Sequence, residues 1–114
     1  MKLYIAAPFE LIDDARLLML KLEALGIEVT SSWLRVGDFA NDDPTARLDL
    51  ADIDRADTVL LLNPEGYQRS GTGGRHFEAG YAYARGKQVV VAGVRSNIFH
   101  SLLDVRVIER VENL

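Results

Sequence analysis

Apolar residues gather in five short runs along the chain, separated by longer segments of mixed character. These runs predict β-strands at residues 2–7, 27–31, 58–62, 88–92 and 105–108. The run at 58–62, TVLLL, is apolar at every position, which is typical of a strand covered on both faces. The pattern is therefore that of a buried parallel sheet.

Between the runs, three segments have the spacing of helices, at residues 11–25, 44–55 and 74–85, and a helical turn is expected within 96–103. Asp43 and Pro44 predict a helix start, with the aspartate as N-cap and the proline at the first helical position. Gly86 is suited to end the third helix. The inward stripes of the first two helices are predicted to be Leu11, Ala15, Leu18, Leu22 and Leu25, and Ala46, Leu50 and Ile53.

Strands that alternate with helices indicate an α/β fold built from right-handed crossover units. Five strands in 114 residues favour a single doubly wound domain spanning residues 1–114, with a five-stranded parallel sheet in the flavodoxin-like order 2-1-3-4-5. In such sheets ligands bind outside the carboxyl ends of the strands, near the point where the strand order reverses. The loops after the first, second and third strands are therefore expected to form the binding site.

Composition and charge narrow the classes of function. A net charge of -4 argues against a partner that is a nucleic-acid polymer, which normally requires a basic surface. The absence of cysteine excludes disulfides and thiolate chemistry, and two histidines with no third ligand give no reason to expect a metal or another cofactor. With no signal-peptide stretch and no apolar run long enough for a membrane, the expected location is cytoplasmic.

A glycine-rich segment, SGTGGR, lies between the third strand and the third helix. Three glycines allow backbone N–H groups to approach a ligand, and the start of a helix favours an anion. The expected ligand-binding residues are Ser70, Gly71, Thr72, Gly73, Gly74 and Arg75. The alternative is a flexible turn followed by a helix cap, since neither a P-loop nor a Rossmann fingerprint is present.

Glu78 stands in a helix that otherwise carries small and apolar residues, including Ala79, Gly80 and Ala82. Such a helix is expected to pack closely on both sides, and a carboxylate directed inward needs either a partner or a chemical role. The alternative is an ordinary solvated side chain. The sequence by itself leaves both open.

Other candidates are less distinct. Asp49 shares its segment with Asp52, Asp54 and Asp57, which we expect to be solvated, paired with Arg47 or Arg55, or used in a turn. Tyr4 is either a core aromatic or a tyrosine whose hydroxyl bonds a carboxylate in the cleft. Trp33 is either a core or rim residue or a contact to the ligand.

Four segments together resemble the nucleoside 2-deoxyribosyltransferase superfamily, including its nucleoside 5′-monophosphate N-glycosidase branch. They are KLYIAAPF, TARLDLADIDRADTVLLL, SGTGGRHFEAGYAYARGKQVVV and VRSNIFHSL, and they span nearly the whole chain. The resemblance implies that Glu78 is the nucleophile, that Asp49 acts at the nucleobase and that Tyr4 orients the nucleophile. Because the loops after the first and second strands are expected at the site, Phe9 and Trp33 are further candidate substrate-binding residues.

The implied reaction is cleavage of the N-glycosidic bond through a covalent glycosyl-glutamate, completed by water or by a second base. Related transferases on free nucleosides place an acid six residues before the nucleophile, where this chain has Thr72. Hydroxyls, glycine amides and an arginine suit a phosphate, so a nucleoside 5′-monophosphate is the expected substrate. The alternatives are a base-exchanging deoxyribosyltransferase and, from another class, a nucleotide-sensing module without turnover.

The resemblance further implies a homodimer or higher homo-oligomer in which a neighbour's late loop completes each site. Asn97 and His100 lie in the matching region and are the candidate residues supplied by the neighbouring copy. The alternative for both is a surface turn.

Overall fold

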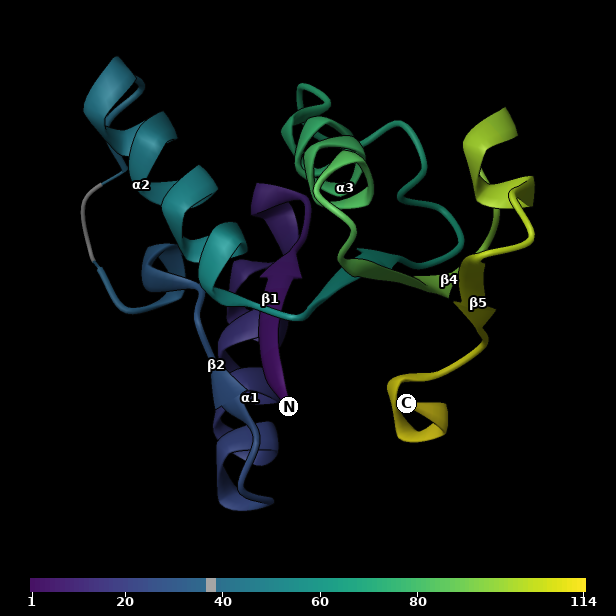
Figure 1. Ribbon diagram of the computed structural model, residues 1–114, viewed down its shortest axis with the longest axis horizontal. Coiled ribbons are helices and arrows are strands. Elements are labelled where there is room, and N and C mark those ends of the chain that lie inside the picture. Colours follow the sequence, from purple (N-terminus) through teal and green to yellow (C-terminus); the bar gives the residue numbers. More distant parts are fainter. Residues whose placement is uncertain (37–38) are drawn as a thin grey trace.

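In the computed structural model, which describes residues 1–36 and 39–114, five parallel strands form one sheet (Figure 1). The strand order is β2-β1-β3-β4-β5, and every neighbouring pair is parallel. This confirms the predicted α/β fold and its doubly wound order. The strands are β1 (Lys2–Ala6), β2 (Glu28–Val29), β3 (Thr58–Asn63), β4 (Gln88–Gly93) and β5 (Val105–Ile108).

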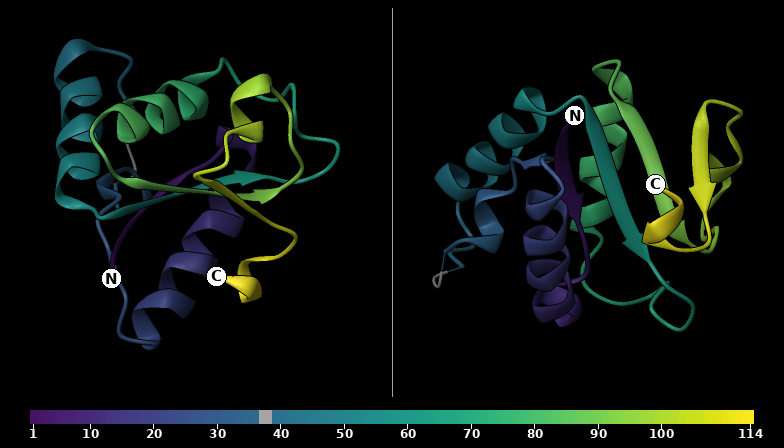
Figure 2. Two further views of the ribbon diagram at one scale, coloured as in Figure 1. Left: turned by 45° about the vertical axis from the view of Figure 1, so that its right-hand side comes forward. Right: turned by 90° about the horizontal axis from the view of Figure 1, so that it is seen from below.

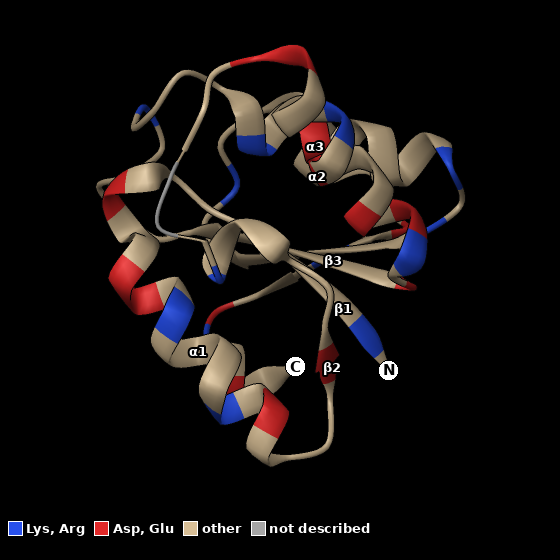
Figure 3. Cartoon of the chain, turned by 90° about the vertical axis from the view of Figure 1, so that its left-hand side faces the viewer, with Lys and Arg blue, Asp and Glu red and all other residues tan. Residues whose placement is uncertain are grey.

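Helix α1 covers one face of the sheet, and α2 and α3 cover the other (Figure 2). None of the helices in the described ranges is long and apolar enough to cross a membrane. On the side drawn in Figure 3, lysines and arginines are interspersed with aspartates and glutamates. The helices are α1 (Ile12–Ala24), α2 (Asp43–Arg55) and α3 (Gly74–Ala84), with short 3-10 helices η1 (Phe9–Leu11), η2 (Ser32–Leu34), η3 (Ile98–Ser101) and η4 (Val111–Asn113).

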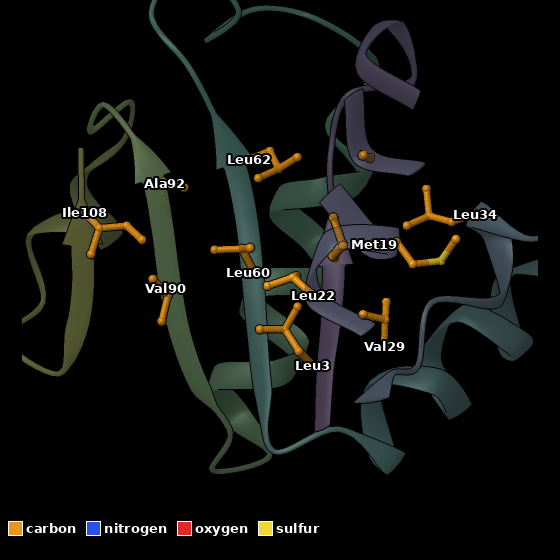
Figure 4. Packing of buried hydrophobic residues seen from close by; sticks show 12 residues of the cluster. Leu3, Met19, Leu22, Val29, Leu34, Leu60, Leu62, Val90, Ala92 and Ile108 are labelled. Carbon is orange, nitrogen blue, oxygen red and sulfur yellow. The ribbon is translucent and has the colours of Figure 1, made fainter. Parts of the chain in front are cut away.

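Successive residues of β1 point to opposite faces of the sheet, because side chains alternate along a strand. Leu3 and Ile5 join the core under α1, together with Met19 and Leu22 of that helix (Figure 4). Tyr4 and Ala6 join the second core, under α2 and α3. The strand β1 therefore brings a tyrosine to the face on which α3 lies.

Some boundaries differ from the predictions. Strand β2 is only two residues long, since Ser31 turns its hydroxyl into the sheet to accept the N–H of Ile5 at 2.7 Å. The N-cap of α2 is Asp42, one residue earlier than predicted, and it accepts the N–H of Thr45 at 3.0 Å. Leu25, predicted to be inward, is 77% exposed after the end of α1.

The carboxyl ends of β3 and β4 are held together at Asn63 and Gly93. Gly93 has a φ of 131°, and a Cβ there would lie 2.0 Å from the carbonyl oxygen of Asn63, so only glycine fits this close approach. The side-chain amide of the buried Asn63 donates to the carbonyl of Val94 at 2.7 Å and to the hydroxyl of Ser96 at 3.1 Å. This junction fixes the edge of the sheet from which the candidate site is built.

Candidate active site

A cleft of about 700 Å³ opens between the carboxyl end of β1, the loop after it, α2 and the start of α3. Its position is the one expected of a doubly wound sheet, beside the point where the strand order reverses. The residues of the cleft that were singled out in the sequence are Tyr4, Phe9, Trp33, Asp49, Gly71, Thr72, Gly73, Gly74, Arg75 and Glu78. Residues 74 positions apart in the chain thus meet in one cavity.

The Tyr4 hydroxyl donates a hydrogen bond to Oε2 of Glu78 inside this cleft. Tyr4 is fully buried in the core, so its ring is packed on all sides, and the bond from its hydroxyl orients the glutamate. The pKa of Glu78 is raised to about 7: burial is the largest cause, the bond from Tyr4 opposes it, and the charges of Asp49 and Asp52 add to it. Burial, followed by the charge of Glu78, also raises the pKa of the Tyr4 hydroxyl, which therefore stays a donor.

Asp49, on the α2 side of the cleft, is one of two further carboxyl groups that line the cavity; the other is Glu10, in the loop after β1. Burial, followed by the charge of Asp52, raises the pKa of Asp49 to about 6. Two carboxyl groups with pKa values near neutrality in one cleft can share the work of a nucleophile and a proton donor.

The loop that leads into α3 presents its backbone to the cleft. Gly73, the N-cap residue, has a φ of 92°, a left-handed conformation that favours glycine. No acceptor among the described residues bonds the N–H groups of residues 71–74, and Gly71 to Gly74 all line the cavity. Unpaired N–H groups at the start of an eleven-residue helix provide donors for an anion.

Arg75 lies beneath this loop, 3% exposed. Its terminal nitrogens donate to the carbonyls of Ser70 at 2.5 Å and Tyr67 at 2.8 Å and to Oδ1 of Asn63 at 3.2 Å. These acceptors are all neutral, so the guanidinium shapes the loop, and the charge that acts on it is that of Glu10 in the same cleft. Burial lowers the pKa of Arg75 from its ordinary value. Ser70 supplies a carbonyl to Arg75 and is not among the residues that line the cleft.

Two aromatic residues named in the sequence stand at the wall of the cleft. Trp33 is half-buried, contacts both cores, and donates its indole N–H to the carbonyl of Ile5 at 2.9 Å. Phe9 is 57% exposed and meets Phe39 edge to face, with ring centroids 5.1 Å apart. Flat apolar surfaces of this kind suit a heterocyclic base.

No protein-family model matches the chain, and no curated protein matches it. A search of solved structures finds the CMP N-glycosidase BcmB of Clostridium botulinum, with a TM-score of 0.66 and 23% sequence identity. The alignment covers 95% of this chain and 86% of the glycosidase. The two proteins share a fold.

Asn97 and His100 lie outside the cleft that contains Glu78. They line a second, apolar cleft of about 770 Å³ on the other side of α3, together with Phe77, Gly80 and Phe99. His100 accepts the N–H of Ser96 at Nδ1 over 3.0 Å, so it is used within its own loop. Burial, followed by the charge of Arg75, lowers the pKa of His100.

The second cleft also shows that one expectation for α3 was wrong. The small residues of this helix do not indicate close packing on both sides, because Gly80 faces open space and Phe77 is 68% exposed. Phe77 lines both clefts, so the two cavities are neighbours across the helix. One face of α3 is therefore an uncovered apolar surface.

Asp52 is a residue that the sequence did not single out. Its side chain is fully buried, and Oδ2 accepts the N–H of Ser32 at 2.9 Å. Its position three residues after Asp49 and one before the inward Ile53 was the available signal, since such spacing places residues on adjoining parts of one helix face. In the described part of the chain, no three His, Asp or Glu side chains gather as a metal site would require.

Proposed function

We propose that this protein cleaves the N-glycosidic bond of a nucleoside 5′-monophosphate and releases the free base, as a member of the nucleoside 2-deoxyribosyltransferase superfamily. The observation that carries the proposal is the bond from the buried Tyr4 to Glu78 in a cleft that also contains Asp49. The fold shared with a CMP N-glycosidase supports it. In this proposal residues 1–114 form one domain of that superfamily.

The reaction follows from the two carboxyl groups. The Glu78 carboxylate attacks C1′ of the sugar, the bond from C1′ to the base nitrogen breaks, and its electron pair goes to the base. Asp49 delivers its proton to the departing base. Water then attacks C1′, frees Glu78 and returns a proton to Asp49, so the enzyme is restored and no cofactor is consumed.

Tyr4 supports the first step by holding Oε2 of Glu78, which leaves Oε1 as the attacking atom. The reaction requires Glu78 ionised and Asp49 protonated, and the pKa values of these groups are about 7 and about 6. We therefore expect kcat/KM to be highest between about pH 6 and 7 and to fall on both sides.

The start of α3 supports a monophosphate as the substrate. The free N–H groups of residues 71–74 and the buried charge of Arg75 form a site for a phosphate, and Thr72 adds a hydroxyl. Phe9 and Trp33 stand where they can contact the base. A free nucleoside would leave the phosphate donors without a partner.

The test is a set of ribo- and deoxyribonucleoside 5′-monophosphates and the matching nucleosides, each with and without an added acceptor base, followed by chromatography of the released base. We expect release from monophosphates, with kcat/KM at least about 100-fold above that of the nucleosides, because two charge-assisted hydrogen bonds are lost with the phosphate. Base exchange on free deoxynucleosides would instead support a deoxyribosyltransferase. Binding without release from any substrate would indicate a nucleotide-sensing module and overturn the proposal.

The uncovered face of α3 supports a further part of this proposal, an assembly of identical chains. Phe77 and Phe99 are each 68% exposed at the apolar cleft, and Ile98 beside it is 78% exposed. Such a surface is suited to a second copy, and Phe77 connects it to the cavity of Glu78. In such an assembly Asn97 and His100 would approach the neighbour's site.

Phe99→Asp should dissociate this assembly, because it would place a charge in the apolar interface. Sedimentation velocity at tens of micromolar protein is expected to give at least twice the 12.7 kDa chain mass for the parent and the chain mass for the variant. Leu20→Asp, at an exposed position of α1 on the opposite face, is the matched control and should remain assembled. A parent that sediments as a monomer would contradict the prediction.

A further inference from the structure

Asp52 is a buried carboxylate for which the proposed reaction has no role. It lies on α2 one helical turn after Asp49 and is fully buried. Burying a charge is costly unless partners compensate for it. A buried carboxylate one helical turn from the candidate proton donor therefore requires an explanation.

Two hydrogen bonds fasten α2 to the segment after β2 at this residue, and an ion pair lies within α2 itself. Oδ2 of Asp52 accepts the N–H of Ser32 at 2.9 Å, and the Asp52 carbonyl accepts the hydroxyl of Thr30 at 2.8 Å. Oδ1 lies 2.7 Å from a terminal nitrogen of Arg55. Because Ser32 begins η2, which carries Trp33, Asp52 joins the helix of Asp49 to the aromatic wall of the cleft.

The charge of Asp52 is only partly compensated. Oδ1 makes no hydrogen bond within the described residues, so its contact with Arg55 is an ion pair alone. Arg55 is 55% exposed, and water screens its charge. The charge of Asp52 therefore acts on Asp49 and Glu78, which line the cleft.

The charged and titratable groups around Asp49 come from four elements. Asp52 and Arg55 lie on the same helix, α2; across the cleft lie Tyr4 on β1, Glu10 on η1, and Arg75 and Glu78 on α3. After burial, the charge of Asp52 is the cause that raises the pKa of Asp49. A negative charge at this position favours the protonated form of Asp49.

We propose that Asp52 is a positioning residue that acts through Asp49. Its carboxylate fixes α2 against η2 and places a negative charge one helical turn from Asp49, so that Asp49 keeps the proton it delivers to the departing base. The role in catalysis rests on the proposed function, whereas the effect of Asp52 on Asp49 is a property of the free protein.

The first test is carbon-13 NMR titration of the Asp49 carboxyl group in the free protein. Asp52→Asn keeps the shape and should lower the pH midpoint of Asp49 by about half a unit or more. Asp54→Asn removes another carboxylate of α2, one that pairs with Arg85 at 3.1 Å on the surface, and should leave the midpoint unchanged. A midpoint within about 0.2 units of the parent in Asp52→Asn would overturn the proposal.

Arg55→Gln should shift the midpoint of Asp49 in the opposite direction to Asp52→Asn. It also replaces Asp52→Asn as the test if that variant does not fold. Removing the counter-charge while Asp52 remains should raise the midpoint of Asp49, because less of the negative charge is compensated. A midpoint that stays constant or falls would overturn the proposal. A loss of packing alone would expose Asp49 to water and lower its midpoint in both variants, so opposite shifts in the two variants identify the effect of charge.

The second test is the pH dependence of kcat with the best nucleotide substrate. The charge of Asp52 raises the pKa of both Asp49 and Glu78, so in Asp52→Asn the pH optimum of kcat should move to lower pH. At pH 7 kcat should fall about twofold, because the smaller protonated fraction of Asp49 outweighs the larger ionised fraction of Glu78, and it should recover at lower pH. A shifted midpoint without any change in kcat would overturn the positioning role. If the parent releases no base from any nucleotide while the midpoint shifts as expected, the proposed function fails and the electrostatic link between Asp52 and Asp49 stands.

Discussion

Glutamine in place of Glu78 should reduce the rate of base release at least about a thousandfold, because an amide cannot attack C1′. Glutamine has nearly the shape of glutamate, and its carbonyl can still accept the hydrogen bond from Tyr4. The site should therefore bind nucleotide and fail in the chemical step. The measurement is kcat and KM for the best monophosphate, together with a binding constant for the variant.

The same variant provides its own control for folding. The folded pKa of Glu78 is about 7, above its ordinary value of 4.5, so stability from this group is present at low pH and is lost as pH rises through about 7. At pH 8 the parent carries a cost of about 3 kcal/mol at most for the ionised group, and Glu78→Gln removes it. We expect the variant to melt at a higher temperature than the parent at pH 8.

Glu109→Gln, at an exposed position after β5, is the matched variant and should change neither turnover nor melting. If Glu78→Gln keeps more than about a tenth of the parent turnover, Glu78 is not the nucleophile.

Asparagine in place of Asp49 should lower kcat about 100-fold or more for ordinary nucleotides, because the departing base no longer receives a proton. The loss should be much smaller for a 5′-monophosphate whose electron-poor base leaves easily as an anion. The two substrates therefore separate proton delivery from binding. The measurement is kcat for both substrates in the parent and in Asp49→Asn.

Asp43→Asn is the matched control for this comparison. Asp43 lies in the first turn of the same helix, where its carboxylate pairs with Arg47 at 2.8 Å on the surface. It should leave both rates near those of the parent. An equal loss for the two substrates in Asp49→Asn would show that Asp49 binds the base and does not protonate it.

The sheet could be predicted because its central strands are buried on both faces. A short, fully apolar run such as residues 58–62 is typical of a strand in such a sheet. The ends of elements were harder to predict. Strand β2 stops early because the hydroxyl of Ser31 replaces a strand contact, and α2 begins at Asp42 because its carboxylate reaches Thr45. Both boundaries depend on single side-chain hydrogen bonds, which an apolar pattern does not record.

The candidate site was predictable where a residue type was unusual for its surroundings. Glu78 stood out among small residues, and the structure brings it to Tyr4. Asp52 did not stand out, because its burial depends on how α2 meets η2. The open face of α3 was also missed, because the presence of a neighbouring element cannot be seen in the helix's own sequence. Glycine and alanine allow close packing but do not show that a neighbour is present.

The chain contains one tryptophan, and that tryptophan is part of the wall of the cleft. Its fluorescence therefore comes from a single position, with the indole N–H held by the carbonyl of Ile5. A ligand that enters the cavity would alter the surroundings of this ring directly. Emission from Trp33 thus offers a label-free signal for titrating nucleotides into inactive variants, in which no product can form.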